Sequence, residues 1–208
     1  MFFVSDIPPS MPLHEARIMC SVEAGMRYGV PPDIVYAVSL NEGGKPGLRV
    51  NNTNGTQDLG LMQFNTAYLK TLRKHGIDEQ DVLGRSCYSF HLAAWRIKSH
   101  IEEKGDNLYK KVAYYHSRTE LFNERYQNRL LENIGLFDWK KAEVYRQIIE
   151  DKISLISMQR AKKTVKQIEL EMPNTSTSNV LELKVDDTLK AIALLDNYEM
   201  VVIPEKKG

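Results

Sequence analysis

The sequence predicts a mainly α-helical protein with a small β-hairpin and loop region, and two observations support this prediction. Apolar residues recur at helical spacing in six segments, near residues 14–28, 32–42, 65–75, 86–104, 107–115 and 119–134. Between the second and third segments lies an asparagine- and glycine-rich stretch, in which Asn54-Gly55 predicts a tight hairpin turn. A chain of 208 residues with 42% hydrophobic content can bury one good core and a small extension.

The helical segments begin and end where local chemistry favours it. After a proline-containing lead, residues 1–13, the first helix should end at Gly29, because glycine readily adopts the left-handed conformation that closes a helix. Pro31 and Pro32 stand where the second helix should begin, since the first turn tolerates proline. We expect these helices to form one domain over residues 14–139.

Residues 140–208 differ in character and form a predicted C-terminal extension. A charged, amphipathic run to about residue 170 is followed by the polar linker PNTSTSN and then by VLELKV and YEMVVI, which favour β structure. We expect an amphipathic helix, a linker and a small α/β tail. The excess of basic residues early in this extension and of acidic residues later favours pairing with each other or with a partner, although an ordinary solvated helix accounts equally well for the pattern.

Glu42 is the residue that says most about function. A helix over PPDIVYAVSLNEGG places Ile34, Val38 and Glu42 in one row, so the carboxyl group continues the apolar face that packs on the core. Apolar surroundings raise the pKa of a carboxyl group, and a protonated acid of this kind can protonate the leaving oxygen of a glycoside. We interpret Glu42 as a candidate general acid, whereas a lone Glu at a helix end is usually a solvated surface residue.

The loop that follows Glu42 has the composition of a carbohydrate site. Its glycines allow positive φ and close approach to a ligand, and its asparagines, Asn54 among them, offer amides to sugar hydroxyls. The segment 60–65, GLMQFN, then supplies a glycine for close approach, two apolar side chains for a sugar face, and two amides. Polar amides among apolar residues suit a sugar.

Three further residues have competing interpretations. Asp58 is a candidate second carboxylate, but we favour a polar turn residue that bonds nearby backbone. For His116 we favour a hydrogen-bonding role over a catalytic base or a metal ligand, because no Cys, Asp or His lies at metal-ligand spacing around it. Trp95 is predicted to lie in the core with His91 and Ile97, and the alternative for Trp95 is stacking on a sugar.

Composition and charge argue against several classes of function. A formal net charge of +1 gives no argument for a nucleic-acid partner, and no phosphate-binding glycine loop is present. We expect no metal and no cofactor. No segment predicts a membrane span, and MFFV is followed at once by Asp6 and prolines, so no signal-peptide core is visible in this chain.

Glu42, the segment DLGLMQFN and the later AYYHS together resemble the SLT-type lytic transglycosylase domain of the lysozyme-like superfamily, over roughly residues 14–130. The resemblance is strongest to the specialised transglycosylases that accompany conjugation and type IV and type III secretion. It implies a lysozyme-like helical domain with the hairpin region at its cleft. It also implies cleavage of the β-1,4 bond between N-acetylmuramic acid and N-acetylglucosamine, leaving a 1,6-anhydromuramoyl end.

Carried over to this chain, the family motifs assign roles to single residues. Glu42 matches the single catalytic acid/base, and Tyr115 matches a motif tyrosine that should orient Glu42. Two positions depart from the usual pattern, because Gly43 replaces a serine and His116 an asparagine. The expected substrate-binding residues are Gly60, Leu61, Met62, Gln63, Asn65, Tyr115, His116 and Asn54.

The resemblance also bears on cysteine chemistry, location and partners. In secretion-associated relatives, cysteines at the places of Cys20 and Cys87 can form a disulfide in an oxidising periplasm, whereas the sequence alone equally allows two buried thiols. The implied partners are peptidoglycan glycan strands and, through residues 140–208, secretion or conjugation machinery. The implied location is the periplasm or cell envelope. Two other functions stay open: a hydrolytic muramidase that uses Asp58, and a non-catalytic wall-binding assembly factor.

Overall fold

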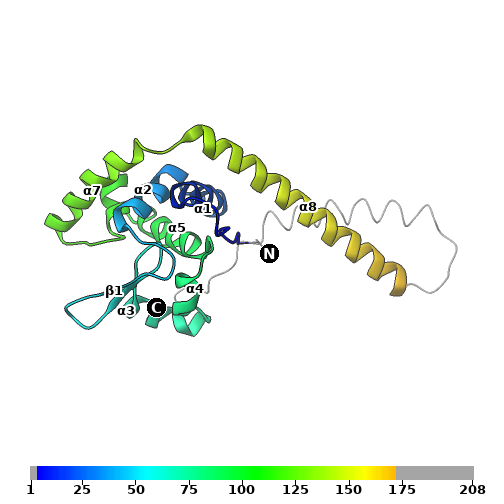
Figure 1. The fold of residues 1–208 in the computed structure, drawn as a ribbon, viewed down its shortest axis with the longest axis horizontal. Coiled ribbons are helices and arrows are strands. Elements are labelled where there is room, and N and C mark those ends of the chain that lie inside the picture. The colour runs from blue at the N-terminus through cyan, green and yellow to red at the C-terminus, as the bar shows by residue number, and fades with distance from the viewer. Residues whose placement is uncertain (1–3, 172–208) are drawn as a thin grey trace. The chain divides into compact units, whose positions relative to one another are not determined.

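The computed structural model describes residues 4–171 of the chain, with side chains to residue 167. Figure 1 shows a helical protein with one small sheet, which confirms the predicted fold class. The elements in chain order are α1 (Leu13–Tyr28), α2 (Pro32–Glu42), β1 (Arg49–Asn51), β2 (Gln57–Leu59), β3 (Phe64–Asn65), α3 (Thr66–Leu72), the 3-10 turn η1 (Arg73–His75), α4 (Glu79–Leu83), α5 (Tyr88–Ile101), α6 (Leu108–Ala113), α7 (Glu120–Ile134) and α8 (Trp139–Glu171). The predicted β segments after residue 180 lie outside the described residues.

The predicted helix boundaries near the site are confirmed. Gly29 closes α1 with φ 66°, and Pro32 occupies the first turn of α2. Gly43 closes α2 with φ 63°, a conformation that glycine adopts without steric cost. The short helix α4 was not predicted, because five residues are too few for apolar periodicity. Its only local signal is the capping box, in which the side chains of Asp78 and Asp81 each accept a backbone N–H at the helix start.

The sheet is a three-stranded antiparallel meander in the order β1-β2-β3. Arg49 pairs with Leu59 across the first two strands, and Asp58 pairs with Asn65 across the second and third. The predicted hairpin is present, with Asn54-Gly55 in its turn. The loop spans residues 52–56 and is closed by a hydrogen bond of 2.8 Å from the Asn52 amide to the Thr56 carbonyl. This loop places Asn54 at the exposed tip of the hairpin.

The core forms where α1, α2 and α5 pack together, and buried residues of the sheet also belong to it. Val35 and Val38 of α2 are completely buried, and Leu59 and Phe64 of the sheet are equally buried. A disulfide joins Cys20 of α1 to Cys87 at the start of α5, with 4.9 Å between the Cα atoms. α2 also packs against α7, and this second contact brings the end of α2 beside a helix far away in the sequence.

The chain divides into two compact units, and each is described by itself. The first covers residues 4–147 and contains the helical core, the sheet and the first turns of α8, where Lys141 Nζ lies 3.0 Å from Glu15 Oε1. Within the described chain, the second unit consists of the remainder of α8. The predicted helix is present there, and its amphipathic character remains a prediction. No helix in the described part of the chain is both long and apolar enough to cross a membrane. The predicted domain boundaries remain predictions.

Candidate active site

Glu42 is the last residue of α2, and its carboxyl group lies at the edge of the core. The row predicted from the sequence is confirmed, because Ile34 and Val38 are 3% and 0% exposed while Glu42 keeps partial exposure. Burial, assisted by the negative charge of Asp58, raises the pKa of the Glu42 carboxyl to about 7. A pKa near 7 leaves a substantial fraction of the carboxyl protonated at neutral pH, as a general acid requires.

Tyr126 of α7 is the residue that holds the Glu42 carboxyl. Its hydroxyl donates a hydrogen bond of 2.8 Å to Glu42 Oε1, and its side chain is 1% exposed. The backbone carbonyl of Tyr126 accepts a hydrogen bond of 3.2 Å from the side-chain amide of Asn41. The side-chain oxygen of Asn41 in turn accepts a hydrogen bond of 2.7 Å from the side-chain amide of Asn133. The last two residues of α2, Asn41 and Glu42, are therefore both hydrogen-bonded to α7.

The sequence did not single out Tyr126, which had the appearance of a core residue on the apolar face of a helix. The role predicted for Tyr115, to orient Glu42, is corrected by this contact. Tyr115 is 5% exposed, and its hydroxyl donates a hydrogen bond of 2.8 Å to the backbone carbonyl of Met62. Tyr115 therefore anchors the loop that carries the GLMQ segment, and its burial raises the pKa of its hydroxyl well above the ordinary value.

The apolar side chains of the GLMQ segment do not offer a face to a sugar. Leu61 and Met62 are completely buried, so the structure corrects this part of the prediction and assigns both side chains to the core beneath the site. Gly60 is needed for a close approach, as predicted, but the approach is to the protein itself. Its φ is 69°, and a Cβ there would lie 2.0 Å from the Val82 carbonyl oxygen. Gln63 keeps partial exposure at a φ of 48°, with its amide donating 2.8 Å to the Gly60 carbonyl.

Asp58 lies on β2 among amide side chains. Its carboxylate accepts hydrogen bonds from the amides of Asn52 at 3.0 Å and Asn65 at 2.8 Å, so its partners are side chains and not the backbone of a turn as predicted. The side-chain oxygen of Asn65 also caps α3 by accepting a hydrogen bond of 2.9 Å from the Ala67 backbone amide. The side chain that was predicted to bind a sugar is therefore already hydrogen-bonded within the protein. At the hairpin tip, the oxygen of Asn54 accepts from Thr56.

His116 lies on the outer side of Tyr126. The two rings stack at 5.0 Å with 12° between their planes, and His116 is exposed on its other face. Burial of its inner face lowers the pKa of His116, and the positive charge of Arg129 lowers it further. The structure therefore places His116 against the residue that holds Glu42. Among the described residues, no group of three or more His, Cys, Asp or Glu side chains gathers as metal ligands would.

Two arginines add positive charge around the site, and sequence reasoning named neither. The guanidinium of Arg96 lies 4.8 Å from the centre of the Tyr115 ring, and that of Arg129 lies 5.9 Å from the centre of the Tyr126 ring. Both charges lower the pKa of Glu42 and so oppose the effect of burial. They favour the carboxylate that remains once the acid has released its proton.

The predicted core neighbours of Trp95 are confirmed. His91 is 3% exposed, and its Nε2 lies 2.8 Å from Oε1 of the buried Glu23. Ile97 is completely buried, and Trp95 is partly buried against the core. These contacts are those of packing residues.

The family model described as Transglycosylase SLT domain matches residues 19–129, more than half of the chain, and the protein belongs to this family. The resemblance inferred from the motifs is thereby confirmed.

Individual relatives are similar over shorter or weaker stretches. The chain is 39% identical over 83 residues to Protein IpgF of Shigella flexneri, which covers 39% of this chain and 54% of that protein. It is 29% identical over 129 residues to Invasion protein IagB of Salmonella typhimurium (strain SL1344), which covers 60% of this chain and 80% of that protein. It is 30% identical over 99 residues to a Peptidoglycan-binding-like protein of Escherichia coli O157:H7, which covers 43% of this chain and 59% of that protein. The chain spans about half the length of the two Shigella relatives that it matches.

Proposed function

We propose that this protein is a peptidoglycan lytic transglycosylase, which cleaves the β-1,4 bond between N-acetylmuramic acid and N-acetylglucosamine and leaves a 1,6-anhydromuramoyl end. One observation carries the proposal. In a domain of the transglycosylase SLT family, Glu42 has a pKa raised to about 7 and is held at 2.8 Å by the buried hydroxyl of Tyr126. A protonated, oriented carboxyl group is what cleavage of a glycoside requires.

The reaction uses Glu42 twice. As an acid, the Glu42 carboxyl donates its proton to the leaving glycosidic oxygen while the bond from that oxygen to the anomeric carbon of the muramoyl residue breaks. As a carboxylate, it then accepts the proton of the muramoyl 6-hydroxyl while that oxygen bonds to the anomeric carbon. Glu42 is protonated again at the end, and no water is consumed.

The surroundings of Glu42 support both steps. Burial favours the protonated form before cleavage. After proton transfer, the hydroxyl of Tyr126 donates to the carboxylate, and the charges of Arg96 and Arg129 stabilise it. The carboxyl group can therefore act first as an acid and then as a base without a second proton carrier.

Asp58 supports a second candidate function, a hydrolytic muramidase. Its negative charge raises the pKa of Glu42, so the two carboxyl groups interact across the site. A second carboxylate allows a retaining hydrolase to stabilise or attack the anomeric carbon before water completes the reaction. This reaction would leave reducing ends in place of anhydro ends.

The decisive experiment is to incubate the protein and its Glu42→Gln variant with peptidoglycan sacculi and to identify the released muropeptides by mass spectrometry. We expect anhydromuramoyl products from the parent protein alone. Reducing-end products that disappear in both Glu42→Gln and Asp58→Asn would establish the muramidase. Binding to sacculi without any released product would leave a wall-binding assembly factor as the function.

We further propose that the protein acts in the periplasm or cell envelope, where peptidoglycan lies, and opens the wall locally for a secretion or conjugation apparatus. A relative named as an invasion protein supports this role. The proposed contact with that apparatus uses residues 140–208. Fractionation of cells that express the protein tests the location, and recovery with the cytoplasmic proteins would contradict it. Cross-linking in the same cells tests the contact, which should be lost when residues 140–208 are removed.

A further inference from the structure

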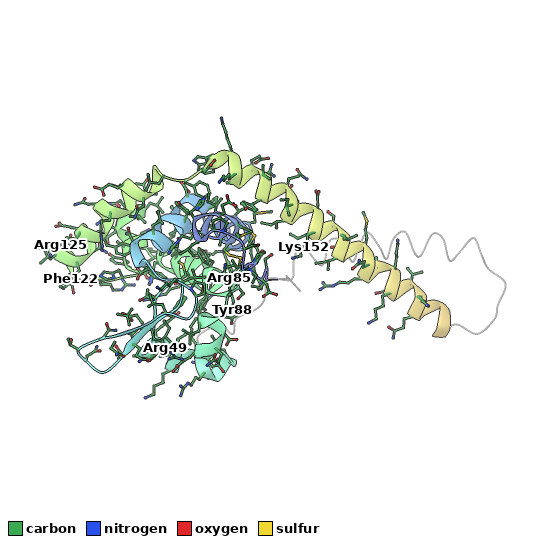
Figure 2. The ribbon with its side chains drawn as sticks, in the orientation of Figure 1. Arg49, Arg85, Tyr88, Phe122, Arg125 and Lys152 are labelled. Carbon is green, nitrogen blue, oxygen red and sulfur yellow. A yellow bond between two sulfur atoms is a disulfide. The ribbon has the colours of Figure 1, made fainter. Side chains whose placement is uncertain are left out.

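A basic cavity lies along α7, next to the site of Glu42. It has a volume of about 510 Å³ and is lined by His116, Phe122, Arg125, Asn128 and Arg129. Four of these residues come from α7 at helical spacing, so they share one side of that helix. Figure 2 labels Phe122 and Arg125, and both side chains are exposed.

The cavity is separated from the catalytic carboxyl by one aromatic ring. His116 lines the cavity and stacks on Tyr126, and Tyr126 donates its hydroxyl hydrogen to Glu42. Arg129 lines the cavity as well, and its charge lowers the pKa values of Glu42 and His116. A ligand group in the cavity would therefore contact residues that surround Glu42, as a second part of a substrate bound at Glu42 would.

The lining of this cavity carries positive charge from two arginines. Arg125 and Arg129 lie one turn apart and are exposed, and neither forms an ion pair with a side chain of residues 4–167. The acidic residues Glu120 and Glu124 line a neighbouring cavity along α7, which shares Asn128 with this one, and Glu120 pairs there with Lys110. Two guanidinium groups in one cavity match the planar, two-oxygen geometry of carboxylates.

A neutral sugar chain does not account for this charge. The hydroxyl and N-acetyl groups of a glycan carry no formal charge, whereas the peptide attached to the muramoyl lactyl group carries free carboxylates. Phe122 is 51% exposed and adds an apolar wall beside the two arginines, as an acidic peptide with aliphatic side chains would need.

We propose that this cavity is a subsite for the acidic peptide carried by the muramoyl residue, with Arg125 and Arg129 binding its carboxylates and Phe122 contacting its aliphatic part. This inference rests on the proposed function, because it assigns the substrate class of the same site. It makes the protein selective for peptide-bearing glycan over glycan from which the peptides have been removed.

The test compares two substrates, intact sacculi and sacculi stripped of peptides by an amidase, and two readouts. Product release measures cleavage, and co-sedimentation of the Glu42→Gln protein measures binding without turnover. Arg125→Gln should lower the ratio of activity on intact to stripped sacculi about three- to tenfold, the loss typical of one partly solvated charge pair. The preference for binding intact over stripped sacculi should fall in the same way. In the parent protein, added salt should also reduce this preference. Phe122→Ala should lower the ratio in the same direction. Arg73→Gln, which removes an exposed arginine from η1, is the matched control and should leave the ratio unchanged.

An unchanged ratio in Arg125→Gln, or an equal loss on both substrates, would overturn the peptide subsite while leaving the cleavage of glycan intact. If the parent protein releases no product from either substrate, the proposed function fails. Co-sedimentation then still decides the inference, since a binding protein with this subsite must prefer intact sacculi in an Arg125-dependent way.

Discussion

At the residue scale, the raised pKa of Glu42 links the proposed chemistry to stability. In the unfolded chain the carboxyl ionises near the ordinary glutamate pKa of 4.5, whereas in the folded protein it keeps its proton up to about pH 7. The folded state therefore loses stability as pH rises through this interval, by a few kcal/mol at most for a shift of this size. The raised pKa that the proposed chemistry uses therefore costs stability at neutral pH.

Replacing Glu42 by glutamine should remove this cost. The Glu42→Gln variant keeps an oxygen that can accept from Tyr126 but cannot ionise, so its free energy of unfolding at about pH 8 should exceed that of the parent by about 1–3 kcal/mol. At about pH 4, where both states of the parent are protonated, the two proteins should be equally stable. Urea unfolding at the two pH values measures the difference, and a gain that is the same at both would contradict the shifted pKa.

Tyr126 should act through the orientation and ionisation of Glu42. Tyr126→Phe removes the hydrogen bond that lowers the pKa of Glu42, so the fall in kcat at alkaline pH should move to higher pH. Loss of a hydrogen bond to a charged group should also lower kcat about tenfold or more, with little change in KM. Tyr109→Phe, at an exposed tyrosine of α6, is the control. A lower kcat with an unmoved pH profile would indicate a packing role only.

Asp58 provides the opposite shift. Its negative charge raises the pKa of Glu42, so Asp58→Asn should lower that pKa and move the fall in kcat to lower pH. The pH profile on sacculi measures this effect. If Asp58→Asn instead abolishes cleavage at every pH, Asp58 takes part in the chemistry and the muramidase gains support.

At the scale of elements, a buried arginine fixes the end of α2, the helix that carries Glu42. Arg17 of α1 is 5% exposed and donates to the backbone carbonyls of Ser39, at 2.8 Å, and Gly44, at 2.6 Å. These carbonyls lie on either side of Glu42 in the sequence, and a positive charge at a helix C-terminus opposes the negative end of the helix dipole. One side chain thus holds both α2 and the loop that leaves it.

Arg17→Met should destabilise the protein by about 2–3 kcal/mol, because it leaves the buried Gly44 carbonyl without a donor and the Ser39 carbonyl with only the Gly43 amide, at 3.3 Å. Arg17→Lys should be intermediate, since an ammonium group cannot reproduce the planar fork that reaches both. Denaturant unfolding measures the stabilities. Equal stability of all three proteins would show that the carbonyls find water instead.

The close approach of β2 to α4 depends on Gly60. Gly60→Ala combines a left-handed φ with a Cβ 2.0 Å from the Val82 carbonyl, whereas Gly55→Ala at the hairpin tip has a similar φ and open space around it. Gly55→Ala should cost about 1 kcal/mol, and Gly60→Ala clearly more. Equal losses in thermal unfolding would mean that the Val82 segment moves aside freely.

At the scale of the molecule, the Cys20–Cys87 disulfide closes a loop with a sequence separation of 67 residues. The loop contains Glu42, the hairpin and Asp58, so the cross-link restricts the unfolded chain around most of the site. A loop of this length corresponds to about 4 kcal/mol of stabilisation in the chain-entropy description. Unfolding of the parent in reductant, or of the Cys20→Ala/Cys87→Ala variant, should show most of this loss. An unchanged denaturation midpoint would argue that the unfolded chain is already compact.

The sequence located several parts of the site because their signals are local. Helical spacing and two flanking glycines were enough to place Glu42 at the end of α2 on the apolar row. The hairpin position followed from one asparagine-glycine pair, although its loop length did not. The motifs around Gly60 and Tyr115 identified the family, yet they misassigned the role of Tyr115.

What the sequence by itself determined was the longer helices, the place of Glu42 at the end of α2 and, through its motifs, the family, since each depends on spacing, capping or motifs within a few residues. Only the tertiary structure decided which tyrosine holds Glu42, because Tyr126 and Glu42 are 84 residues apart and meet through the packing of α7 on α2. It likewise decided that Leu61 and Met62 belong to the core and that the two cysteines pair. These outcomes depend on which surfaces of distant elements are buried together, and no local pattern contains that information.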